Sequence, residues 1–197
     1  DTWMCPPDLV RQVFAAHASQ ADISVIEGVM GLFDGARVGG LQGSSADLAL
    51  LLEAPVILVV NVEAMAQSCI ALVKGYRDYH PGVKLGGVIL NRASAYHRTY
   101  IQPAMEQELG LPVLGCFEHN KEIQMPERHL GLLPADENRA LTGLIQGMAD
   151  MVEKQLDLDR LLYIARTAPA MGMVAEKRLE PARIRLGVAR DKAFSYY

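Results

Sequence analysis

Short apolar runs alternate along this chain with longer segments in which apolar residues recur every three or four positions. The runs are continuously apolar, as in VILVV and GGVIL, which is typical of strands buried on both faces of a parallel sheet. The predicted strands are Ile23–Gly28, Pro55–Val62, Leu85–Asn91 and Pro112–Cys116. The predicted helices are Asp8–Ala18, one that opens at Ser44 or Ser45, Met65–Tyr79 and His97–Leu109. This order predicts an α/β fold with a doubly wound, mostly parallel sheet.

The pattern changes after Cys116. A loop over Gln124–Pro134, with a further strand near Leu130–Leu133, precedes helices at about Asp136–Gln155 and Leu158–Arg166. The segment Thr167–Pro181 has the composition of a linker, and Arg183–Ala189 predicts the first strand of another domain. We therefore divide the chain into residues 1–166, a linker 167–181 and a second domain that starts at 182–197. Since the chain begins without methionine and stops just after a strand, we expect it to be a piece of a longer protein.

Composition excludes several classes of function. The net charge of −4 comes without a basic stripe, so nucleic acid is not an expected partner. The longest apolar stretches, such as Ala54–Val62, are far shorter than the ~20 residues of a membrane span, so no membrane is expected either. Cys5, Cys69 and Cys116 are too far apart to suggest a disulfide framework or a zinc site, which fits a cytoplasmic protein.

The strongest chemical signal is the segment that follows the first predicted strand. The nine residues Glu27–Gly35 include two carboxylates, Glu27 and Asp34, and three glycines. Glycines let backbone approach a ligand closely, and a carboxylate leaving an apolar strand needs a cation or another partner. Ligands of open α/β sheets bind at the carboxyl ends of the strands, where Mg²⁺ with nucleotide phosphates is a frequent occupant. The alternative is a glycine-rich turn whose Glu27 pairs with an arginine.

Two further positions carry polar side chains after strands. Asn91 can present a donor and an acceptor to a nucleotide base, or it can cap the next turn. Arg128 and His129 are candidate site residues, although such a pair in a loop is more often structural.

The chain contains no GxxxxGK[ST] phosphate-binding string and no cysteine in a G-x-C-x-G setting. We therefore expect that this polypeptide cannot catalyse a reaction alone.

Several strings together resemble cobyrinic acid a,c-diamide synthases. They are VIEGVMGLFDG at Val25–Gly35, GSSADL from Gly43, GVILNR at Gly87–Arg92 and PERHLGL at Pro126–Leu132, with DTWM at the start. The closing RDKAFSYY resembles the start of that family's glutamine amidotransferase domain. The resemblance implies a synthetase domain of the P-loop NTPase and dethiobiotin synthetase type, with its phosphate-binding loop upstream of this segment.

The resemblance also implies a reaction and residue roles. ATP phosphorylates a carboxylate of a corrinoid, and ammonia derived from glutamine displaces the phosphate, first at the c and then at the a position. Glu27 matches an acid that holds Mg²⁺ and the γ-phosphate, with Gly28 beside it. Asp34 matches an acid near the reacting carboxylate, in a substrate-proximal loop that includes Gly31, Gly35 and Ser44. Asn91 falls where related proteins hold adenine.

Three alternatives remain open at this stage. A sister diamide synthase would act on hydrogenobyrinic acid or nickel sirohydrochlorin, and nothing in the sequence fixes the central metal. A ParA/MinD-like ATPase switch would share the sheet. A homodimerisation segment would pack its C-terminal helices between protomers.

Overall fold

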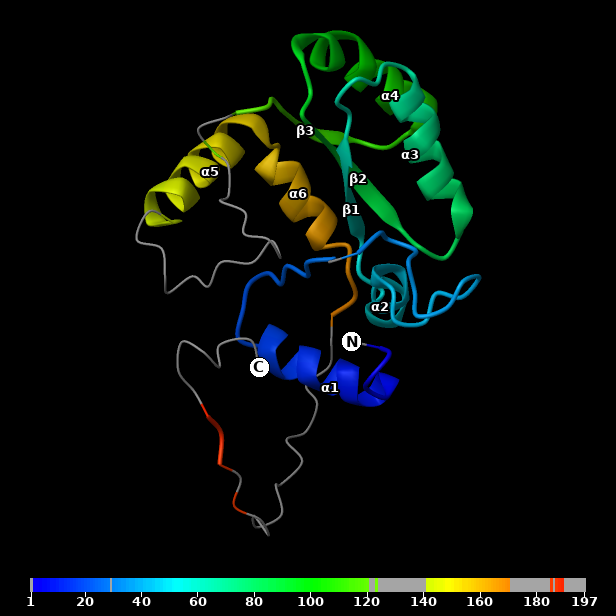
Figure 1. Ribbon diagram of the computed structural model, residues 1–197, viewed down its shortest axis with the longest axis vertical. Coiled ribbons are helices and arrows are strands. Elements are labelled where there is room, and N and C mark those ends of the chain that lie inside the picture. Colours follow the sequence, from blue (N-terminus) through cyan, green and yellow to red (C-terminus); the bar gives the residue numbers. More distant parts are fainter. Residues whose placement is uncertain are drawn as a thin grey trace. The chain divides into compact units, whose positions relative to one another are not determined.

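The computed structural model shows a parallel sheet with helices on both faces (Figure 1). It describes residues 2–28, 30–120, 123, 141–170, 185 and 187–189. The elements of the described chain are α1 (Pro7–Ala18), α2 (Ser45–Leu52), β1 (Val56–Asn61), α3 (Ser68–Tyr79), β2 (Leu85–Asn91), η1 (His97–Ile101, a π-helix), α4 (Gln102–Leu109), β3 (Val113–Phe117), α5 (Leu141–Gln155) and α6 (Leu158–Ala165). The predicted α/β class with a parallel sheet is confirmed.

The strands lie in the order β1–β2–β3, and both pairs are parallel. Their last residues are in register, since Asn61 pairs with Asn91 and Asn91 pairs with Phe117. The loops that follow β1 and β2 therefore leave the sheet at one carboxyl edge. Each helix between two strands returns the chain to the opposite, amino edge, as parallel pairing requires.

One face of the sheet carries the main core. Leu58, Val60, Val88 and Leu90 are buried there against α3, η1 and α4, whose contributions include Val73, Ile101 and Met105. The opposite face receives α6, because a Cβ on Gly86 would lie 2.5 Å from Cγ2 of Ile164. Apolar side chains on both faces explain why the strand sequences are continuous rather than alternating.

Most predicted elements are confirmed within a few residues. Ser44 is the N-cap of α2, and its Oγ accepts a hydrogen bond from the N–H of Asp47 at 3.0 Å. The predicted helix His97–Leu109 begins as the π-helix η1 and continues as α4. The predicted strand Arg183–Ala189 is not a strand at the four positions that the structure describes. The loop Gln124–Pro134, with its strand Leu130–Leu133, lies outside the described residues.

The predicted strand Ile23–Gly28 is wrong. These residues belong to no strand or helix, and Val25 is 89% exposed. A strand requires a neighbour for its backbone groups, and in the described chain β1 pairs only with β2. Apolar composition alone does not supply that neighbour, so the run stays outside the sheet.

The chain divides into two compact units, Asp1–His119 with Gln155–Val174, and Asn120–Lys154 with Ala175–Tyr197. The first contains the sheet, and the second contains α5 up to Lys154. The predicted boundaries of a linker at 167–181 and a second domain from 182 stay predictions, since most of these residues lie outside the described part. No helix of the described chain combines the length and apolarity needed to cross a bilayer.

Candidate functional site

The acidic glycine loop (residues 30–43) is held against the start of α2. The N–H of Ala46 donates to the carbonyl oxygen of Leu32 at 2.9 Å. The N–H of Gly43 donates to Oδ2 of Asp47 at 3.0 Å while Asp47 N–H donates to Ser44, so the two sides of the cap support each other. Gly28 lies here as well, because a Cβ at that position would meet Oγ of Ser45 at 2.7 Å.

Two glycines of this loop are in close contact with it, Gly31 with the side chain of Asp34 and Gly35 with backbone. A Cβ on Gly31 would lie 2.2 Å from Oδ2 of Asp34, so the carboxylate folds directly over the glycine. The N–H of Asp34 also donates to the carbonyl oxygen of Gly31 at 3.0 Å. A Cβ on Gly35 would meet backbone oxygens of Gly40 and Gln42 at 2.6 and 2.9 Å. The glycines of the motif therefore form a tight turn, and Asp34 lies at this turn.

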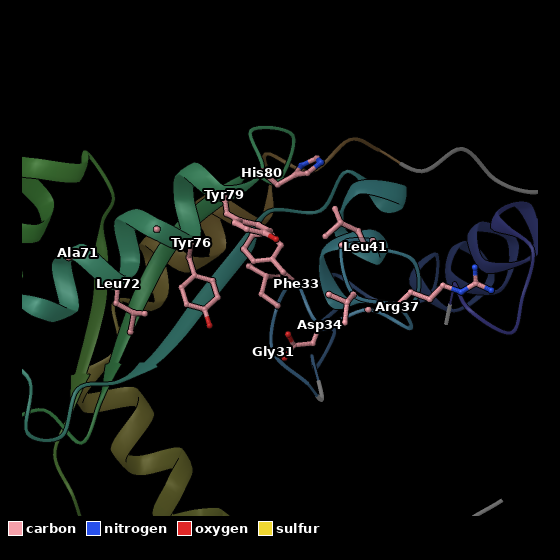
Figure 2. A pocket seen from close by; sticks show the side chains of 16 residues that line it. Gly31, Phe33, Asp34, Arg37, Leu41, Ala71, Leu72, Tyr76, Tyr79 and His80 are labelled. Carbon is pink, nitrogen blue, oxygen red and sulfur yellow. The ribbon is translucent and has the colours of Figure 1, made fainter.

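Asp34 faces a cleft of about 850 Å³ between the glycine loop and α3 (Figure 2). The loop side includes Gly31, Phe33, Asp34 and Gly35. The helix side includes Ala71, Leu72, Gly75, Tyr76 and Tyr79. Phe33 closes one end, with its ring centroid 5.8 Å from that of Tyr76 and 4.7 Å from that of Tyr79. The lining thus combines two charged residues, Asp34 and Arg37, with the rings of Phe33, Tyr76, Tyr79 and His80.

The cleft runs along α3, from Ala71 and Leu72 in the first turns of the helix to Tyr79 and His80 at its end. Because residues 23–28 form no strand, the loop after them is held by its contacts with the start of α2. The predicted position of the acidic loop at the carboxyl edge of the sheet stays a prediction.

Glu27 and Asp34 are both exposed, and only Asp34 lines the cleft. Within the described residues no group of three or more His, Cys, Asp or Glu side chains is arranged to hold a metal ion. Mg²⁺ bound with a nucleotide usually takes one or two protein carboxylates and completes its shell with phosphate oxygens and water. An exposed Glu27 next to Gly28 fits a metal that arrives with phosphates rather than a protein-only site.

Ser44 and Asn91 have local partners. Ser44 is 3% exposed and its hydroxyl caps α2, so it supports the loop from beneath and does not line the cleft. Asn91 ends β2 at the carboxyl edge, where its Oδ1 accepts the N–H of Arg92 at 3.0 Å. That contact is the turn-capping alternative, and it leaves the side-chain amide N–H groups of Asn91 available for a base edge.

The carboxyl edge also carries residues that the sequence did not single out. Arg92 NH1 lies 2.6 Å from Oε2 of Glu63, which joins the loops after β2 and β1. Arg92 and Ala64 both have positive φ, 54° and 58°, an uncommon backbone conformation for residues other than glycine. Uncommon backbone conformations in neighbouring loops at a sheet edge accord with a binding role for this edge.

His97 connects the same two loops from inside. It is buried, and its Nδ1 accepts the N–H of Ser94 at 3.0 Å. Its Nε2 is 3.0 Å from the carbonyl oxygen of Met65; because a carbonyl can only accept, Nε2 carries the hydrogen. No motif in the sequence marks His97, because its contact with Met65 joins positions 32 residues apart in the chain.

The described cysteines do not form a nucleophile site. Burial raises the pKa of the Cys69 and Cys116 thiols, which keeps both protonated near neutral pH. Sγ of Cys116 donates a hydrogen bond to Oε1 of Gln102 at 3.5 Å. Cys5, Cys69 and Cys116 are all free of disulfide bonds. Arg128 and His129 lie outside the described residues.

Comparison with known proteins supports the motif assignments. A family model described as "AAA domain" matches residues 8–127. A cobyrinate a,c-diamide synthase of Dehalococcoides mccartyi strain CBDB1 is 41% identical over 100% of this chain and 44% of its own length. A hydrogenobyrinate a,c-diamide synthase of Agrobacterium fabrum is 40% identical, again over the whole chain and 45% of its own length. No solved structure matches. The chain spans less than half the length of these curated relatives, and the resemblance inferred from the motifs is confirmed.

Proposed function

Because this chain belongs to the AAA domain family, we propose that it forms part of an ATP-dependent a,c-diamide synthase acting on a corrin-type tetrapyrrole. The observation that most supports this proposal is the turn in which Asp34 folds over Gly31 and faces the cleft. Cobyrinate and hydrogenobyrinate a,c-diamide synthases match over the whole of this chain, which covers 44% and 45% of their own lengths.

In this proposal the acidic loop positions a carboxylate substrate. Two anions, the substrate carboxylate and the triphosphate, must approach each other, so catalysis consists mainly of positioning and charge neutralisation. The substrate oxygen attacks the γ-phosphorus, ADP leaves, and ammonia from glutamine attacks the acyl carbon and expels phosphate. Glu27, with Gly28 beside it, would hold Mg²⁺, and the ion would supply charge neutralisation on the phosphates.

The residues of this chain supply three contributions. Asp34, which lies over Gly31, is placed beside the reacting carboxylate and accepts a proton from the attacking ammonia. Gly35 lets the loop close on itself, which keeps water from the reactive acyl phosphate. Asn91, at the end of β2, presents its amide to adenine, while the Arg92–Glu63 pair fixes the turn around it.

The test uses the product of the complete reading frame. Cobyrinate, ATP and glutamine are incubated with the protein, and mass spectrometry follows conversion of carboxylates to amides together with ADP release. Glu27→Gln is expected to lose most amidation by weakening metal–phosphate binding. Asp34→Asn is expected to lower turnover more than it raises the KM for ATP. Near-normal amidation rates for both variants would refute the assignment of Glu27 and Asp34 to the active site.

Hydrogenobyrinate is the second candidate substrate, because hydrogenobyrinate synthases match the chain as well as cobyrinate synthases do. The two substrates differ in whether cobalt occupies the ring. Parallel assays with both compounds decide between them, and nickel sirohydrochlorin serves as a third substrate for the remaining alternative. Cytoplasmic location and homodimerisation stay predictions from the sequence, and sedimentation of the intact protein tests the latter.

A further inference from the structure

The side of α3 that lines the cleft carries exposed apolar side chains. Along α3, Leu72, Gly75, Tyr76 and Tyr79 line the cleft at helical spacing. Tyr79 is 68% exposed although it is large and aromatic. Exposed apolar side chains that gather along one cleft indicate a binding surface more often than isolated ones do.

Gly75 is the second observation. A glycine in a helix interior costs about 1 kcal/mol relative to alanine. No atom lies within 4 Å of the position that a Cβ on Gly75 would occupy, so packing within the described residues does not require glycine there. Gly75 does line the cleft, together with the small Ala71. Close approach of a ligand to the helix backbone explains the missing side chain.

The rings fix the shape of the site. Phe33 is nearly parallel to Tyr76, at 20°, and tilted by 46° from Tyr79, so the three rings frame one end of the cleft (Figure 2). Ala71 and Gly75 leave a shallow strip beside them. A strip of this kind suits a ligand with a broad apolar face rather than a narrow chain.

From this geometry we propose that the cleft between the glycine loop and α3 seats the macrocycle of the tetrapyrrole substrate, with a ring face against Gly75 and Tyr79. This rests on the proposed function and deepens it, since it assigns α3 to substrate recognition. Asp34, on the opposite wall, then stands next to the ring periphery, where the carboxylates are. Arg37 also lines the cleft, with its side chain extended away from the three rings (Figure 2).

The experiment measures binding of cobyrinate to the intact protein without ATP, by equilibrium dialysis with absorbance detection. Gly75→Leu places a side chain in the strip, and Tyr79→Ala removes a stacking face; each is expected to weaken cobyrinate binding about tenfold. Tyr100→Ala is the matched control, because Tyr100 is also exposed, at 62%, and also contacts one aromatic ring, that of Tyr96. Its affinity is expected to stay within about twofold of the parent. ATP binding by all three variants is expected to be unchanged.

The outcomes separate this inference from the proposed function. Wild-type protein that amidates cobyrinate while Gly75→Leu and Tyr79→Ala bind it normally would overturn the cleft assignment and keep the function. Cleft-dependent binding without amidation would keep the assignment and refute the function. A change from dimer to monomer in Tyr79→Ala, with cobyrinate affinity unaltered, would show that α3 meets a second copy of the chain and would also overturn the assignment.

Discussion

Nε2 of His97 donates a hydrogen bond to the carbonyl oxygen of Met65 at 3.0 Å, so a buried side chain after β2 holds the loop that follows β1. The opposite ring nitrogen accepts the N–H of Ser94 and lies 2.9 Å from its hydroxyl. Both polar ends of the ring are therefore satisfied inside the protein. The carboxyl edge, with Asn91, is braced by this histidine as well as by the Arg92–Glu63 ion pair.

His97→Ala is expected to lower the free energy of unfolding by about 2–3 kcal/mol. The substitution leaves the Met65 carbonyl and the Ser94 N–H without their buried partner, and it also leaves a cavity. Equilibrium urea denaturation measures the change. His119→Ala, at an exposed position after β3, serves as the control and should stay within about 0.5 kcal/mol of the parent. Equal values for the two variants would show that His97 does not brace the loops.

Neighbouring valines on β1 provide a test of the sheet's burial. Val60 is 5% exposed in the main core, whereas Val59 is 60% exposed on the other face. Val60→Ala is expected to cost about 2 kcal/mol, because two buried methyl groups are removed. Val59→Ala should cost about 0.5 kcal/mol, mostly through reduced strand preference. Thermal denaturation of both variants checks the ranking, and the reverse order would mean that the faces of β1 are wrongly assigned.

Predicting the fold from the sequence succeeded where one run of residues contains its own signal. The strand Leu85–Asn91 has the predicted bounds, and Ser44 caps the helix as predicted, because a continuous apolar run and a capping hydroxyl are local features of the sequence. The strand Ile23–Gly28 failed because a strand depends on a neighbour that its own sequence does not specify.

The candidate site shows a similar division. The glycines around Asp34 are visible as a motif, and the structure gives Gly35 a backbone contact that excludes a side chain and Gly31 a contact with the carboxylate of Asp34. Tyr76 and Tyr79 carry no motif, and they join the site only because α3 packs beside the glycine loop. Contacts between segments distant in the chain determine such residues, so local patterns do not reveal them.

The thiols allow a pH test. Burial raises the pKa of Cys69 and Cys116, so the folded protein disfavours both thiolates. A group whose pKa is higher in the folded state contributes stability that is fully present below the unfolded pKa, near 8.5, and is lost as pH rises through the folded value. Stability should therefore fall more steeply above pH 8.5 in the parent than in a Cys69→Ala, Cys116→Ala double variant.

Thiol labelling measures the same effect directly. Cys5 is only partly buried, whereas Cys69 and Cys116 are buried. With a disulfide reagent at pH 8, Cys5 is expected to react first, and the two buried thiols should react only as the protein unfolds. Cys5→Ser is the control that removes the fast phase. Rapid labelling of Cys116 in folded Cys5→Ser protein would contradict its burial.

Gly31→Ala tests whether the turn serves to present Asp34. The new Cβ would lie 2.2 Å from Oδ2 of Asp34, so the carboxylate must swing away from its place over the glycine. We expect amidation by the intact protein to fall at least about tenfold, equivalent to about 1.4 kcal/mol of lost transition-state stabilisation, with the KM for ATP little changed. Gly40→Ala is the matched control in the same loop, because its nearest neighbour would be the Arg37 carbonyl oxygen at 3.8 Å, an ordinary contact. If Gly31→Ala and Gly40→Ala turn over alike, the position of Asp34 does not limit the reaction. If both fail equally, the loop as a whole matters and Asp34 has no special part in it.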